Sequence, residues 1–117
     1  MNIEVRLKRV YDPPAGDDGV RVLVDRVWPR GVRKEQAHVH EWLPELGPST
    51  ELRKWFNHDP ARWEEFRSRY RVELSAAEQR VRLERLRSLA TDRPVTLVYG
   101  AKDPVHNQAV VIAEELR

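Results

Sequence analysis

The feature that most constrains the fold is an apolar run in the last third of the chain, residues 94–100, PVTLVYG. Its branched apolar residues lack polar alternation, which is typical of a strand buried on both faces of a parallel sheet. Behind it, Asp103 suits a helix N-cap and Pro104 the first helical position, so a helix is predicted to begin there. A strand that leads into a helix leaves a loop at the strand's carboxyl end, where open α/β sheets bind ligands.

A second apolar run, VRVLVDRVW at residues 20–28, predicts another strand, which breaks at the Pro-Arg-Gly turn of residues 29–31. The alternating stretch at residues 3–10 predicts a half-buried N-terminal strand. The fold class is therefore α/β. It is predicted to be a small sheet whose parallel strands 20–28 and 94–99 are neighbours joined by a helical crossover, with a C-terminal helix.

Helix signals fill the segment between these two strands. A short helix or turn is expected near residues 37–42, although the pattern there is weak. Further helices are predicted to begin at Ser49 or Thr50 and at Asp59-Pro60. The run Ser-Ala-Ala-Glu at 75–78 fits a capping box, and the helix behind it is predicted to bury the apolar residues Val81, Leu86 and Leu89.

Composition excludes several classes of protein. A chain of 117 residues predicts a single domain, 1–117, and 40% apolar with 34% charged residues is not the composition of a disordered chain. No apolar run approaches the roughly 20 residues that span a bilayer, and no signal-peptide core is present, so a cytoplasmic location without membrane contact is expected. The absence of cysteine rules out disulfides, thiol nucleophiles and cysteine-based metal sites. Glycine-rich phosphate cradles and serine elbows are also absent, and no cofactor can be named.

A candidate site follows from the predicted sheet, because parallel strands place their carboxyl ends side by side. Guanidinium groups bind carboxylate or phosphate in a bidentate fork, and a helix N-terminus offers free N–H groups to an anion. A neutral imidazole in the first helical turn can act as general acid or base. The predicted catalytic residues are His106 and Asp25, and the predicted ligand-binding residues are Arg26, Trp28, Arg30, His58, Lys102, Asp103 and Asn107.

Each of these residues also has a structural interpretation. Asp25 with Arg26 can form an ion pair, Arg30 can bind carbonyl groups, and the tryptophans can belong to the core. Two histidines, His38 and His40, share a short segment, but without a third ligand nearby they do not predict a metal site.

Three sequence blocks in this order carry a resemblance to a known family. They are DRVWPRG at 25–31, LRKWFNHDPARWEEFRSRY at 52–70 and YGAKDPVHNQAVVI at 99–112. The chain resembles the bacterial YeaO-like family, a domain of unknown function numbered 488, over essentially its whole length. The resemblance implies a compact α/β domain and brings no established activity. Gln108 stands where many relatives are expected to have a second histidine, so any metal or proton chemistry of that histidine would be compromised here.

The leading functional hypothesis is a pocket protein that binds, and could transform, a small anionic metabolite, with a nucleotide-like compound as one candidate. The net charge of +2 does not by itself indicate nucleic acid. Residues 62–87 nevertheless carry eight arginines against five glutamates, so a nucleic-acid-binding module that uses the helices of residues 61–90 is an alternative. A protein-interaction module is the third hypothesis, and it would show an exposed apolar patch.

Overall fold

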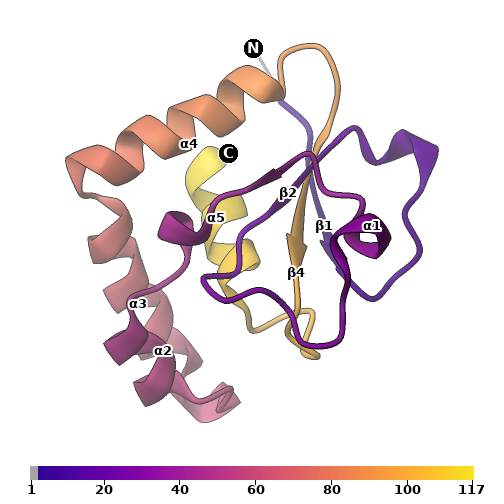
Figure 1. Ribbon diagram of the computed structural model, residues 1–117. Helices are drawn as coiled ribbons and strands as arrows, with labels where there is room; N and C mark the ends of the chain where they lie inside the picture. The colour runs from indigo at the N-terminus through magenta and orange to yellow at the C-terminus, as the bar shows by residue number, and fades with distance from the viewer. Residues whose placement is uncertain (1–2) are drawn as a thin grey trace.

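A computed structural model describes residues 3–117 and contains a four-stranded, all-parallel sheet in the order β1-β4-β2-β3 (Figure 1). The strands are β1 (Val5–Arg9), β2 (Val20–Leu23), β3 (Glu41–Trp42) and β4 (Val95–Tyr99). The helices are α1 (Lys34–Ala37), α2 (Thr50–Phe56), α3 (Trp63–Leu74), α4 (Ala77–Leu89) and α5 (Gln108–Leu116).

The central pair of strands is the one that the sequence predicts. β2 and β4 are parallel neighbours, with Val20 opposite Val95 and Leu23 opposite Val98, and the segment between them supplies the helical crossover. β1 pairs with the other side of β4 and is also parallel. The predicted α/β class, N-terminal strand and C-terminal helix are therefore confirmed.

Apolar residues of the two central strands alternate between two layers of core. Val22 and Leu97 belong to the larger cluster, which includes apolar residues of α2 to α5. Leu23 and Val98 belong to a smaller cluster on the α1 side. Figure 1 shows α2, α3 and α4 to one side of the sheet and α1 to the other. This two-sided burial explains why these strands read as continuous apolar runs.

The second strand is shorter than the predicted range of residues 20–28. Regular pairing ends at Leu23, and one further backbone hydrogen bond runs from the Val24 N–H to the Val98 carbonyl at 3.0 Å. The backbone carbonyl of Asp25 no longer accepts a hydrogen bond from a neighbouring strand and accepts the Trp42 indole N–H at 2.7 Å instead. The chain leaves the sheet at this point, and the residues that follow form a loop.

The segment near residues 37–42 was predicted as a helix or turn and contains a short helix followed by a strand. α1 ends at Ala37, and β3 then pairs with β2 through Val22 opposite Glu41. The prediction was wrong for Glu41 and Trp42, because only two residues pair and neither shows strand periodicity.

Two of the three helix starts in the crossover are as predicted. The Ser49 hydroxyl accepts the Leu52 N–H at 3.2 Å at the start of α2. The Asp59 carboxylate accepts the Ala61 N–H at 3.0 Å at the start of a 3₁₀ helix, Pro60–Arg62, which leads directly into α3. The third start was wrong, because α4 has Ala76 as its N-cap and the Ser75 hydroxyl donates to the Val72 carbonyl at 2.6 Å.

The inward face of α4 also differs from the prediction. Val81 is 71% exposed, whereas Leu83 and Leu86 are fully buried. The helix begins later than the capping box implied, and its buried stripe includes Leu83 in place of Val81.

The last helix also begins later than predicted. Asp103 and Pro104 form a turn, in which the Asp103 carboxylate accepts the N–H groups of Val105 at 2.8 Å and His106 at 3.1 Å. α5 starts at Gln108, and its N-cap is Asn107, whose side-chain oxygen accepts the Ala109 N–H at 2.9 Å. His106 therefore precedes the helix and does not lie in its first turn.

Within the described residues, none of the helices has the length and apolar character needed to cross a bilayer.

Candidate functional site

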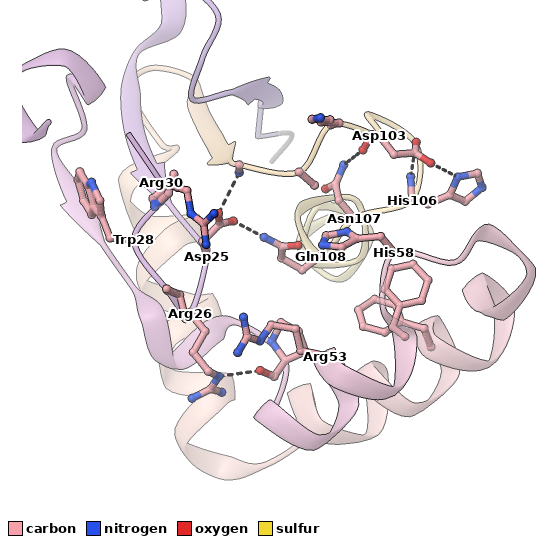
Figure 2. A pocket seen from close by; sticks show the side chains of 18 of the residues that line it. Asp25, Arg26, Trp28, Arg30, Arg53, His58, Asp103, His106, Asn107 and Gln108 are labelled. Atoms are coloured by element: carbon pink, nitrogen blue, oxygen red, sulfur yellow. Dashed lines mark hydrogen bonds and ion pairs between the residues drawn. The ribbon is translucent and has the colours of Figure 1, made fainter. Parts of the chain in front are cut away.

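A cavity of about 770 Å³ lies at the carboxyl ends of β2 and β4 (Figure 2). Its walls come from the loop after β2, the carboxyl-terminal half of α2 and the loop after β4. All nine residues singled out from the sequence line it: Asp25, Arg26, Trp28, Arg30, His58, Lys102, Asp103, His106 and Asn107. The expected convergence of two distant polar loops is thus seen in the fold, and the role of each residue depends on its own contacts.

Asp25 connects the ends of the two central strands. One of its carboxylate oxygens accepts the Gly100 N–H at 2.9 Å, and the other accepts the Gln108 side-chain amide. Burial raises the pKa of Asp25 from 3.8 to about 6, although these hydrogen bonds and the charge of Arg53 oppose the shift. A carboxyl group whose pKa is raised in this way, in a cavity, is a candidate functional group.

Three cationic side chains of the cavity have no acidic partner. Arg30 follows β2, Arg53 lies in the last turn of α2, and Lys102 follows β4; all three are exposed. Among residues 3–117, none of them forms a salt bridge, and their side chains donate no hydrogen bond to the protein. These cations are therefore available to an anionic ligand.

Arg26 lines the cavity but is held by the backbone. Its guanidinium donates to the Pro48 carbonyl at 2.6 Å and to the Gly47 carbonyl at 2.8 Å. A Cβ atom on Gly47 would lie 2.9 Å from the Arg26 backbone nitrogen, so only glycine fits there. Arg26 thus fixes the segment before α2 against the end of β2, and it is not counted among the free cations.

The loop after β4 is organised by hydrogen bonds around Asp103. The His106 Nδ1 atom lies 2.7 Å from the Asp103 carboxylate, and the Asn107 amide donates to the Asp103 carbonyl at 2.9 Å. The His106 hydrogen bond is the main cause that lowers the pKa of Asp103. Asn107 is buried and uses its oxygen as the α5 N-cap, so its side chain already has backbone partners on both ends.

Aromatic side chains form the apolar wall of the cavity. Phe56 stacks on Phe66 with ring centroids 4.3 Å apart, and the His58 ring tilts against Phe56 at 6.4 Å. On the other side, Trp28 meets Trp42 edge to face at 5.3 Å and donates its indole N–H to the Val32 carbonyl. Trp28, a predicted ligand-binding residue, therefore lies in the cavity wall.

Sequence reasoning missed two polar residues of the site. Arg53 lies on a short helix whose charged residues look like an ordinary solvated face, so no local signal distinguishes it from Lys54. Gln108 was noted only as a departure from the expected histidine, and its contact with Asp25 spans 83 positions of sequence. Arg53 and Gln108 belong to the site only because the tertiary structure brings them to the cavity, so the sequence around them gives no signal.

No cluster of three or more potential metal ligands is found among residues 3–117. His38 and His40 lie at the other end of the sheet, beside a shallow second hollow, and the His40 Nδ1 atom accepts the Arg21 backbone N–H at 3.0 Å.

The fold and cavity define a small α/β protein with a pocket at the carboxyl ends of its parallel strands. A family model described as "Inactive DUF488-N3 subclade" matches residues 4–117, and the chain belongs to this DUF488 family of YeaO-like proteins.

Among its relatives is the uncharacterised protein YeaO of Escherichia coli K12, 46% identical over all of this chain and 98% of its own. The uncharacterised protein Rv3073c of Mycobacterium tuberculosis H37Rv is 45% identical over 96% of this chain and 92% of its own. No solved structure matches the chain.

Proposed function

We propose that this protein binds a small anionic metabolite in the pocket at the carboxyl ends of β2 and β4. The observation that carries the proposal is the set of three unpaired cations, Arg30, Arg53 and Lys102, which reach the same cavity from three different segments. Guanidinium and ammonium groups bind carboxylate and phosphate through charge-assisted hydrogen bonds. The cavity is open rather than filled by its own side chains, which favours a ligand over a purely structural role.

The arginines of the helical segment, unlike the three cations of the pocket, already have protein partners. All eight arginines between residues 62 and 87 have a protein partner, and the strongest pairs are bidentate, as between Arg67 and Glu114 and between Arg85 and Glu41. The other six are Arg62, Arg69, Arg71, Arg80, Arg82 and Arg87. Seven of these guanidinium groups face carboxylates and Arg82 faces the Gln79 amide oxygen. Paired guanidinium groups offer little net charge to a phosphate backbone, so the nucleic-acid alternative gains no support.

Binding without turnover is the version of the function that we favour. The family model describes its subclade as inactive. In addition, Asp25 and His106 lie at opposite sides of the pocket in Figure 2, so they do not form one acid–base pair. The contact that favours catalysis is the Asp103–His106 hydrogen bond, in which a carboxylate orients an imidazole. His106 therefore stays a candidate acid or base, and a turnover assay on ligands found by binding would test it.

The binding proposal can be tested with a panel of phosphorylated and carboxylated metabolites, with inorganic phosphate as reference. Thermal shift identifies compounds that bind the wild type, and isothermal titration calorimetry then measures their affinity for Arg53→Ala and Lys102→Ala. Each substitution removes a charge-assisted contact of about 1.5–3 kcal/mol, so affinity is expected to fall about tenfold or more.

The matched controls are Lys54→Ala and Lys34→Ala. Lys54 is the sequence neighbour of Arg53, and both lysines are exposed and lie outside the pocket lining. Their affinities are expected to equal that of the wild type. Equal losses in the control and pocket variants, or no binding of any anion, would overturn the proposal.

A further inference from the structure

We infer that the pocket selects a zwitterionic ligand, one that carries an ammonium or similar cationic N–H group for Asp25 in addition to its anionic group. This inference rests on the proposed function, because it names the chemical class of the ligand in that same pocket. Asp25 is thus assigned as the residue that determines specificity.

The first observation is that Asp25 has no cationic partner. No lysine, arginine or histidine nitrogen within the described residues lies within 4 Å of its carboxylate, and its two hydrogen bonds come from neutral donors, Gly100 and Gln108. Arg53 affects it only through space. Charged groups that are withdrawn from water are ordinarily paired, so an unpaired carboxylate in a pocket wall is unusual.

Asp18, which is more deeply buried than the half-buried Asp25, shows the ordinary arrangement. Asp18 is 4% exposed and accepts hydrogen bonds from two cations, Lys8 at 2.8 Å and Arg21 at 2.6 Å. The same fold therefore supplies two cations to the carboxylate that has a structural role. It supplies none within bonding distance to the carboxylate that faces the cavity. A cationic group of the ligand would form an ion pair with the Asp25 carboxylate, as Lys8 and Arg21 do with the Asp18 carboxylate.

The second observation is that Asp25 can accept more hydrogen bonds. An ionised carboxylate offers about four lone-pair sites, and Gly100 and Gln108 occupy one on each oxygen. Asp25 lines the cavity, so the remaining acceptor sites are open to a bound molecule. Because the Gly100 and Gln108 contacts hold the carboxylate in place, a ligand meets an acceptor that is already oriented.

The third observation is the sign of the charge around Asp25. The pocket lining contains the free cations Arg30, Arg53 and Lys102 and two carboxylates, Asp25 and Asp103. Asp103 already has a hydrogen-bond partner in His106. Asp25 has no such partner, so its charge repels a simple anion and attracts a cation. A zwitterion satisfies both signs, whereas an anion without an N–H donor leaves Asp25 unpaired and close to a like charge. Discrimination by an unfavourable charge contact is a common source of specificity.

The apolar wall indicates what joins the two charged ends of the ligand. Phe56, Phe66 and Trp28 all line the cavity, and Phe56 stacks on Phe66. A volume of about 770 Å³ is within the range of small-molecule pockets. The ligand is therefore expected to have a flat or apolar body between its anionic and cationic groups.

The test uses matched pairs of probes that differ only in the amine. Isothermal titration calorimetry on the full chain, above the pKa of Asp25, compares para-aminomethylbenzoate with para-methylbenzoate. It also compares para-aminomethylphenylphosphonate with para-methylphenylphosphonate. In the wild type the aminated member is expected to bind about tenfold more tightly or better, as one charge-assisted hydrogen bond provides.

The variant that carries the argument is Asp25→Asn, with Asp25→Ser as a second variant should the first not fold. Either is expected to remove the preference for the amine while binding of the methyl probes persists. Asp92→Asn, at an exposed carboxylate outside the pocket, is expected to keep the full preference. Equal affinity for both members in the wild type, or a preference that survives in both Asp25 variants, would overturn the inference and leave anion binding intact. No binding of any probe would overturn both proposals.

Discussion

The backbone N–H of Gly100 donates to the carboxylate of Asp25 at 2.9 Å, which joins the ends of two strands that are 75 positions apart in the sequence. The contact depends on the absence of a side chain at position 100. A Cβ atom there would lie 2.8 Å from the same carboxylate oxygen and 3.4 Å from Pro29. The end of β4 can therefore approach the end of β2 only with glycine in this place.

Gly100→Ala is expected to lower the free energy of unfolding by about 1–3 kcal/mol, the usual cost of forcing an extra methyl group into a packed site. Urea unfolding followed by tryptophan fluorescence measures it. The control is Gly16→Ala, because a Cβ atom on Gly16 meets nothing within 4 Å. If the two variants lose the same stability, close approach to Asp25 is not the reason for glycine at position 100.

Asp25→Asn is expected to stabilise the protein at neutral pH. The pKa of Asp25 is raised from 3.8 to about 6, so the folded state binds this proton more tightly than the unfolded chain. Above pH 6 the buried charge therefore costs stability, by up to about 3 kcal/mol, and the cost is relieved as the pH falls from 6 towards 4. Asparagine has no charge to bury and can still accept the Gly100 N–H.

Urea unfolding of wild type and Asp25→Asn at several pH values tests this linkage. The difference between the two proteins should be largest above pH 6 and should shrink towards pH 4. A variant less stable than the wild type at neutral pH would mean that the lost hydrogen bonds outweigh the buried charge. Asp92→Asn, which is exposed, should show no such pH-dependent difference.

The charge of Asp18, unlike that of Asp25, is expected to stabilise the folded protein at neutral pH. Its burial alone would raise the pKa, but hydrogen bonds from Lys8, the Ala15 N–H and Arg21 outweigh that effect and lower the pKa from 3.8 to about 2. The stabilisation is therefore complete above pH 4 and is lost as the pH falls through about 2.

Asp18→Asn is expected to cost about 3–5 kcal/mol at neutral pH, because it leaves the 3%-exposed Arg21 without its carboxylate. Thermal and urea unfolding measure the loss. Asp17→Asn is the neighbouring control, since the Asp17 side chain is 80% exposed and its contact with Arg6 is 3.4 Å long. Comparable losses at both positions would contradict a special role for the buried pair.

The sequence predicted the parts of the fold that are encoded in continuous hydrophobic patterns. The runs before Gly100 and Asp25 are buried on two faces, so they identify β4 and β2 as a parallel pair. β3 was missed because only two residues, Glu41 and Trp42, pair with β2, and a strand of two residues has no hydrophobic pattern to detect. The start of α5 was misplaced because Asp103 and Asn107 are both good caps, and the sequence does not say which one the helix uses.

The candidate site was predictable to the extent that topology determines it. Parallel strands bring the loops after β2 and β4 together whatever their side chains do, so Asp25 and Lys102 were placed correctly on one cavity. Arg53 could not be found in this way, because its place in the cavity depends on how α2 packs on the sheet. The carbonyl partners of Arg26 could not be predicted from the sequence either, because they depend on the path of the backbone at Gly47 and Pro48.

Substitution of Arg26 is expected to affect mainly stability, and substitution of Arg30 mainly ligand binding. Arg26 donates two hydrogen bonds to backbone carbonyls, so Arg26→Ala should lower the free energy of unfolding by about 2 kcal/mol. Arg30 is exposed and its guanidinium has no protein partner in residues 3–117, so Arg30→Ala should change stability by less than about 0.5 kcal/mol. For the affinity of an anion that binds in the pocket, Arg30→Ala is expected to have the larger effect. Arg30→Ala should weaken it about tenfold, whereas Arg26→Ala, at a temperature where the variant is folded, should change it by less than about threefold.

Urea unfolding and isothermal titration calorimetry on the same two variants measure both quantities. The comparison is internally matched, because each substitution removes one guanidinium from the same loop after β2. If Arg26→Ala weakens anion binding as strongly as Arg30→Ala and leaves stability unchanged, then Arg26 is a ligand-binding residue, as its sequence position suggested. In that case its carbonyl contacts give way when a ligand enters, and the free cations of the pocket number four instead of three.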